Sequence, residues 1–199
     1  MESFNHRGKE VVFWSITGEV IGNNKYSETH SSVSVSAGRN SYRRNGGFDV
    51  HSSSETITNH EFWIKTEDGL EKDITLRDAN IPLRQGQKIT IISAGINGAG
   101  SGWYSILVNH SAGKHWFICS AEKLNWHLKL ELITGKSLLI AIPMFFGTSY
   151  FSESWGLALG VTGVFIVYRL AVKLRRMSNL KNRLKQHLES LAQLAYKNH

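Results

Sequence analysis

The feature that most constrains this chain is an almost uncharged block of 32 residues, 137–168. Glu153 is its one charged residue and separates apolar stretches of 16 and 15 residues. A helix needs about 20 apolar residues to cross a bilayer core of about 30 Å. Flanking residues extend each stretch to that length, because Lys and Arg near a helix end can carry their charge to the interface. We therefore predict a two-helix transmembrane hairpin over 132–174, turning at 147–153.

The net charge of +7 is concentrated behind this block. Residues 169–199 hold eight basic residues and one acidic residue, whereas residues 1–168 hold 15 of each sign. Basic residues directly after a hydrophobic segment are typical of the cytoplasmic side of a membrane. A nucleic-acid-binding protein would spread them over its folded face, so no nucleic-acid partner is expected.

The amino-terminal end indicates the same side of the membrane. Residues 1–10 are polar, and no apolar run of a secretory signal follows them. A single cysteine, Cys119, suits a reducing compartment. We expect an integral membrane protein with two spans and both termini cytoplasmic. A bacterial inner membrane is favoured, because the chain is compact and shows no eukaryotic sorting signal.

Residues 11–119 show strand and turn signals throughout. Gly18 follows a β-branched and aromatic run and is placed for a bulge. Phe62 and Ile64 should face one way and Trp63 the other, before a tight turn at Asp68-Gly69. Six to eight short strands, with turns every 8–12 residues, predict a small all-β sandwich or barrel over residues 1–120 that folds alone.

Two segments lack the strand pattern, residues 23–54 and the glycine-rich strand connector 95–102. Residues 23–54 are rich in Ser, Gly, Asn and His, which predicts a long mobile loop or a loose hairpin. Residues 121–131 have the composition of a helical bridge, with Trp126 where an interfacial aromatic residue would lie. The expected fold class is therefore an α+β membrane protein: a cytoplasmic β-domain, the hairpin, and a basic amphipathic helix over 175–199.

Small residues and one proline distinguish the hairpin. Pro143 should kink the first helix, because it removes a backbone donor and crowds the preceding turn. Gly156, Gly160 and Gly163 give the second helix a surface that another helix can approach closely. They pack either against the first helix or against a second copy of the chain. No acid or base lies within either span, which argues against an ion pathway.

The tail combines basic residues with an apolar stripe that includes Leu180, Leu184, Leu188 and Leu191. One interpretation is a helix on anionic lipid headgroups, with the leucines in the bilayer and each basic residue gaining about 1 kcal/mol near the surface. The other is a partner helix or short coiled coil. The predicted membrane-surface residues are Arg175, Arg176, Lys181, Arg183 and Lys185.

No pattern of catalysis or cofactor binding emerges. The glycines of 98–102 are spaced wrongly for a dinucleotide loop and precede a strand rather than a helix. The candidate metal ligands His110, His115, Cys119 and His127 match no compact zinc spacing. We therefore predict no catalytic, cofactor-binding or metal-binding residues, and no cofactor.

These patterns favour a membrane-tethered binding module: an adaptor or assembly subunit that is not an enzyme. Its expected partners are the lipid bilayer, anionic headgroups, and either further copies of itself or another membrane protein. Two alternatives stay open. One is a small oligomeric channel or membrane-perturbing effector, and the other is a membrane-anchored enzyme whose pocket the sequence does not reveal.

Overall fold

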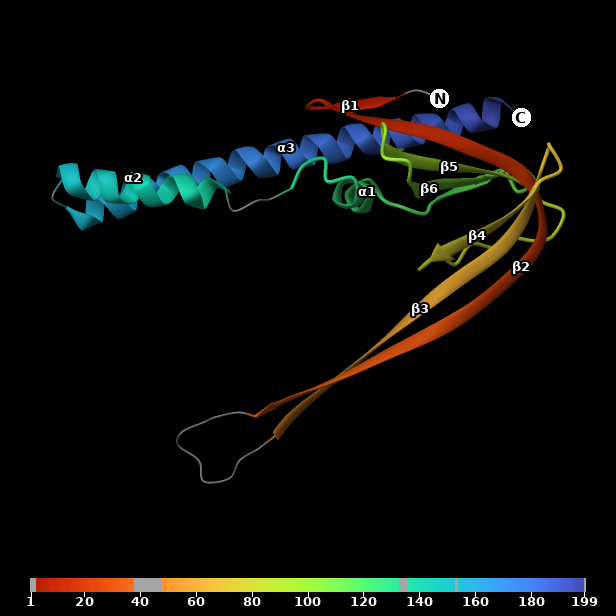
Figure 1. Cartoon of the computed structure of the whole chain (residues 1–199), viewed down its shortest axis with the longest axis horizontal. Coiled ribbons are helices and arrows are strands. Elements are labelled where there is room, and N and C mark those ends of the chain that lie inside the picture. Colours follow the sequence, from red (N-terminus) through yellow and green to blue (C-terminus); the bar gives the residue numbers. More distant parts are fainter. Residues whose placement is uncertain (1–2, 38–47, 133–135, 153, 199) are drawn as a thin grey trace. The chain divides into compact units, whose positions relative to one another are not determined.

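The computed structural model describes residues 3–37, 48–132, 136–152 and 154–198, and within them the chain is α+β (Figure 1). The described part contains three helices and an antiparallel sheet of seven strands. The strands are β1 (Phe4–His6), β2 (Lys9–Ala37), β3 (Phe48–Thr66), β4 (Glu71–Arg77), β5 (Lys88–Ile96), β6 (Trp103–Asn109) and β7 (Lys114–Phe117). The helices are α1 (Ala121–His127), α2 (Lys136–Ser152) and α3 (Trp155–Lys197).

The strands form one sheet in the order β4-β3-β2-β5-β6-β7, with β1 paired to β2. The antiparallel sheet confirms the β-rich part of the prediction, and the finer sandwich or barrel architecture stays a prediction. The sequence pattern specifies strands and turns but not their neighbours. β2 pairs with β1, β3 and β5 because it is 29 residues long, which a prediction of short strands did not anticipate.

The segment 23–54 is a hairpin rather than a loop over its described residues. β2 and β3 stay in antiparallel register from Gly22↔Trp63 to Ala37↔Phe48. Residues 38–47 of the predicted loop lie outside the described residues. Ser and Thr pair readily across strands, so the backbone ladder continues where the apolar alternation ends.

The β3–β4 turn confirms the expected alternation. Phe62 and Ile64 are buried while Trp63 is exposed, and Gly69 adopts a φ of 79° in the turn. The bulge, however, is not at Gly18: the register between β2 and β3 shifts between Val20 and Gly22. A Cβ on Gly18 would lie 2.6 Å from the carbonyl oxygen of Lys65, so glycine there permits close backbone approach instead.

The chain divides into two compact units, while the predicted domain boundaries stay a prediction. The first comprises 1–15, 91–106 and 119–199, and the second comprises 16–90 and 107–118. β1, the start of β2, and parts of β5 and β6 are therefore in the same unit as the three helices. That residues 1–120 fold alone stays a prediction, but the helical end of the chain is part of the first unit.

The helices also differ from the expected segments. The predicted bridge is α1 followed by a turn in which Lys129 has a φ of 49°, and the Ser120 hydroxyl accepts a hydrogen bond from the backbone N–H of Lys123 at the start of α1. α2 and α3 contact each other, and the two-helix transmembrane hairpin stays a prediction. α3 runs through residue 174 without interruption, so the predicted apolar helix and amphipathic helix are one helix of 43 residues.

Candidate membrane anchor and its junction with the folded unit

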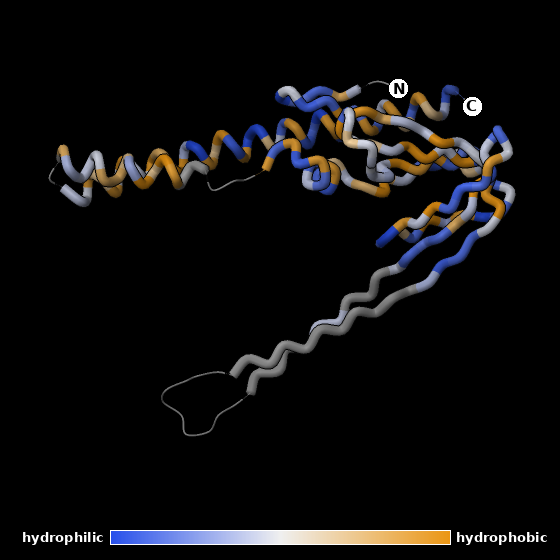
Figure 2. The backbone as a smooth tube through the Cα atoms, viewed as in Figure 1, coloured by the Kyte–Doolittle hydropathy of each residue, from blue (hydrophilic) through white to orange (hydrophobic). Residues whose placement is uncertain are grey.

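The first candidate site is the apolar surface of α2 and of α3 up to residue 174, which we call the anchor (Figure 2). Its large apolar side chains are exposed: Val164 is 72% exposed and Phe151 is 88% exposed. Soluble monomers rarely expose a continuous apolar surface of this kind. Of the described helices, α3 alone is long and apolar enough to span a membrane, while α2 contributes a shorter apolar helix.

The predicted glycines of α3 have open space around them. Ala158 and Thr162 are the buried residues in this part of α3. A Cβ built on Gly160 or Gly163 would meet no described atom within 4 Å. Helix packing through these glycines, against α2 or against a second copy, stays a prediction.

Gly156 and Gly160 instead line an apolar groove of about 550 Å³ with Met144, Val164 and Tyr168. If a second copy packs there, Gly160→Leu fills the groove and should convert the oligomer to monomer, because large groups inserted in a packed contact cost about 1–3 kcal/mol. Analytical ultracentrifugation in detergent measures this. Ala171→Leu, an exposed small-to-large change on the same helix, is the control. An unchanged mass for Gly160→Leu would place these glycines against lipid.

Pro143 lies inside α2, which continues through it to Ser152. One turn later, the Thr148 hydroxyl lies 2.8 Å from the carbonyl oxygen of Met144 and 3.0 Å from that of Phe145, and bonds both. Such side-chain bonds satisfy backbone carbonyls where water is absent. The kink at Pro143 stays a prediction.

One face of the second half of α3 is buried in protein, whereas the sequence predicts a helix on lipid or against a partner helix. Its buried face consists of Leu180, Leu184, Leu188, Leu191, Ala192 and Ala195. Within the first unit α3 contacts α1 and β1. The buried positions are spaced by four, four, three and four residues from 180 to 195, which is the period of a globular helix face and not of a heptad. The interpretation that placed the leucines in the bilayer is therefore wrong.

Aromatic rings extend this buried face. The His187 ring lies 5.5 Å from the ring of Phe4 and 5.1 Å from that of Phe13, measured between centroids. The Arg183 guanidinium lies 5.4 Å from the centroid of Phe4, a distance typical of a cation–π contact. His187, which interrupts the leucine row in the sequence, thus joins α3 to β1 and the start of β2.

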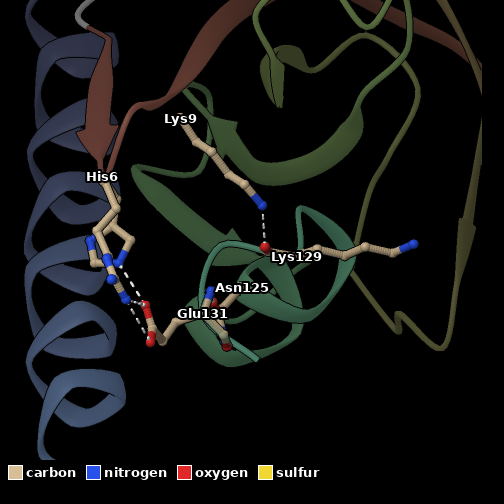
Figure 3. A network of polar contacts seen from close by, with 6 residues as sticks. His6, Lys9, Asn125, Lys129 and Glu131 are labelled. Atoms are coloured by element: carbon tan, nitrogen blue, oxygen red, sulfur yellow. Dashed lines mark hydrogen bonds and ion pairs between the residues drawn. The ribbon is translucent and has the colours of Figure 1, made fainter. Parts of the chain in front are cut away.

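A polar network joins the amino terminus to the segment after α1 (Figure 3). Glu131, 7% exposed, accepts hydrogen bonds from Arg7 at 3.2 Å on both oxygens and pairs with His6 Nε2 at 3.3 Å. Burial acts to raise the pKa of Glu131, but the bonds and charges of His6 and Arg7 outweigh it and hold the pKa below its usual value. Glu131 is therefore ionised at neutral pH.

Asn125 fixes the backbone that carries Glu131. The Asn125 amide donates to the Glu131 carbonyl at 3.0 Å, and its side-chain oxygen accepts from the Glu131 N–H at 2.9 Å. The Lys9 ammonium donates to the Lys129 carbonyl oxygen in the same turn. The bonds from His6, Arg7 and Lys9 to this segment join residues 120–125 positions apart in sequence, and no local pattern could have predicted them.

The five predicted membrane-surface residues are all exposed, but they are not equivalent. Lys181 forms an ion pair of 2.7 Å with Glu122 of α1, and Arg183 lies over Phe4. Arg176 faces the network around Glu131. Arg175 and Lys185 have no such contact among the described residues. Binding of all five to lipid headgroups stays a prediction.

The described residues contain no group of three His, Cys, Asp or Glu side chains that could hold a metal ion. Two of the candidate ligands have other partners: His127 stacks on Trp103 at 3.9 Å, and His110 hydrogen-bonds to the Thr90 hydroxyl at 2.8 Å. No protein-family model, curated protein or solved structure matches this chain.

Proposed function

We propose that this protein is a membrane-tethered adaptor or assembly subunit. The observation that carries the proposal is the continuity of α3: one half presents exposed apolar side chains, and the other half is buried in the folded unit. A single helix without a linker would hold the folded unit at a fixed distance from the bilayer. Such a fixed geometry suits binding and assembly at a membrane surface.

The length of the anchor fits a bilayer. Residues 155–174 of α3 extend about 30 Å at 1.5 Å per residue, which is the thickness of the hydrocarbon core. Arg169 and Lys173 lie in the last turns of this segment, where their side chains can extend to the interface. Arg175 and Arg176 follow at headgroup depth, as expected for the cytoplasmic side.

We further propose that α2 crosses beside α3, giving two spans with both termini cytoplasmic, in a bacterial inner membrane. α2 is apolar, contacts α3, and is separated from it by two residues. Binding to further copies, or to another membrane protein, would use the exposed anchor surface. With this topology, the first unit outside the anchor and the basic residues after it lie on the same, cytoplasmic side of the membrane.

Cysteine labelling tests the topology. The native Cys119 is buried, and burial raises its pKa to about 11 although Lys123 acts the other way, so it should react slowly. In a Cys119→Ala background, we expect Tyr150→Cys to react with an impermeant maleimide in intact spheroplasts. Lys197→Cys should react only after permeabilisation. If Tyr150→Cys also requires permeabilisation, α2 does not cross and the two-span proposal fails.

A further inference from the structure

A second feature of the junction is a pocket of about 320 Å³ between α3, the β1–β2 turn and the segment after α1. Its charged lining comes from His6, Arg7, Glu131, Arg176 and Arg183, with Asn179 as a neutral hydrogen-bonding residue. All of these residues belong to the first unit. Neither the amino terminus nor α3 forms this pocket alone.

The charges in this pocket do not balance. Glu131 is the one carboxylate among the described lining residues, and Arg7 already bonds both of its oxygens. Arg176 and Arg183 have no ion-pair partner among the described residues, although Arg183 contacts the Phe4 ring. Three arginines against one glutamate leave a net charge of +2 on these four residues.

The chemistry of the lining selects one kind of ligand. Guanidinium groups present parallel N–H donors whose spacing matches two oxygens of a phosphate. Glu131 holds the Arg7 guanidinium in place. Binding a ligand therefore costs less side-chain conformational entropy at Arg7. Arg176 and Arg183 are seven residues apart, two turns of α3, and therefore lie on one face of the helix.

The position of the pocket along α3 suggests that lipid headgroups could supply the phosphate. Arg176 lies about 3 Å beyond Leu174, and Arg183 about 10 Å further, at 1.5 Å per residue. The pocket therefore begins at headgroup depth if α3 spans the bilayer as proposed. A lipid phosphate would reach it from the side of the anchor.

We propose that this pocket binds a phosphate group, held by Arg176 and Arg183 with Arg7 and His6 beside them. The ligand is the headgroup of an anionic phospholipid or a free phosphate ester. The lipid source rests on the proposed membrane anchor, whereas phosphate binding itself does not. In a defined site, the arginines that line the pocket contribute more to phosphate binding than basic residues outside it. On a diffuse basic surface, all of them would contribute about equally.

The test uses the full chain, purified in neutral detergent, and measures affinity by native mass spectrometry and thermal shift. The probes are dihexanoyl phosphatidylglycerol, glycerol phosphate, and dihexanoylglycerol as the acyl control without phosphate. We expect Arg176→Gln and Arg183→Gln each to weaken binding of both phosphate probes by at least about tenfold. Arg175→Gln removes the same charge one residue away, outside the pocket, and should weaken it by less than about threefold.

Arg176→Lys keeps the charge but not the paired donors, so an intermediate loss should identify guanidinium recognition even if the glutamine variants fold poorly. At least tenfold tighter binding of the lipid than of glycerol phosphate identifies a lipid site, and equal binding identifies a free phosphate ester. Equal losses at Arg175, Arg176 and Arg183 would overturn the proposal in favour of diffuse attraction. Binding of dihexanoylglycerol as tightly as the phosphate probes would also overturn it. If labelling shows that the anchor is not in lipid but the pocket still binds glycerol phosphate, the proposed membrane function fails and the phosphate site stands.

Discussion

Leu184→Ala is expected to lower the free energy of unfolding by about 2–5 kcal/mol, because it leaves a cavity in a packed core. Leu184 is 0% exposed and occupies the middle of the buried face of α3. The matched control is Leu194→Ala on the same helix, where the side chain is 39% exposed and the expected loss is below about 1 kcal/mol. Chemical denaturation of the detergent-solubilised chain, followed by tryptophan fluorescence, measures both.

Similar losses for the two variants would contradict the buried face. They would mean that the leucines of α3 do not pack in the first unit, and the earlier interpretation of a helix on lipid or a coiled coil would return. A loss at Leu184 that depends on protein concentration would point to a second copy as the partner.

Acidification should destabilise the second unit through His60. Burial, with a smaller contribution from the charge of Lys25, lowers the pKa of His60 from 6.5 to about 4. Its Nε2 lies 2.6 Å from the side-chain oxygen of Asn23, and its Nδ1 has no partner among the described residues. The folded state therefore favours neutral histidine, so this stability is complete above pH 6.5 and falls as the pH drops toward 4. The loss approaches roughly 3 kcal/mol.

The control for this titration is His60→Gln, which can still donate to Asn23 but does not ionise. Melting temperatures of both proteins between pH 7.5 and 4 should diverge, with the variant nearly flat where the native chain loses stability. A variant with the same acid-induced loss would assign the effect to other groups.

Much of the fold could be predicted where one periodicity dominates. The alternation at Phe62, Trp63 and Ile64 and the Asp68-Gly69 turn predicted β3 and β4, and the uncharged block predicted the apolar helices. These signals are local, since side chains alternate across a strand and repeat every 3.6 residues on a helix. In the polar stretch of residues 23–37, only the Ser/Val alternation over 32–36 predicts a strand, and it covers a small part of the hairpin that pairs with β3.

Less of the candidate site could be predicted from the sequence, because its contacts join segments that are distant along the chain. Leu180, Leu184 and Leu188 were recognised as an apolar stripe, but an amphipathic helix looks the same whether lipid or protein covers it. The positions of Arg7 and Glu131 carried no sequence signal. Arg7 follows β1 and Glu131 follows α1, and both β1 and α1 contact α3, an arrangement that a sequence pattern does not encode.

The most direct test of the membrane anchor compares thiol labelling at two exposed positions of α3. In the Cys119→Ala background, Val164→Cys and Gln193→Cys are both exposed in the folded chain, since Val164 is 72% exposed and Gln193 is also at the surface. Folding alone therefore gives them similar reaction rates with a water-soluble maleimide. In native membranes we expect Val164→Cys to react at least about tenfold more slowly, because hydrocarbon suppresses the thiolate and excludes the reagent. Equal rates at the two positions would contradict the membrane anchor.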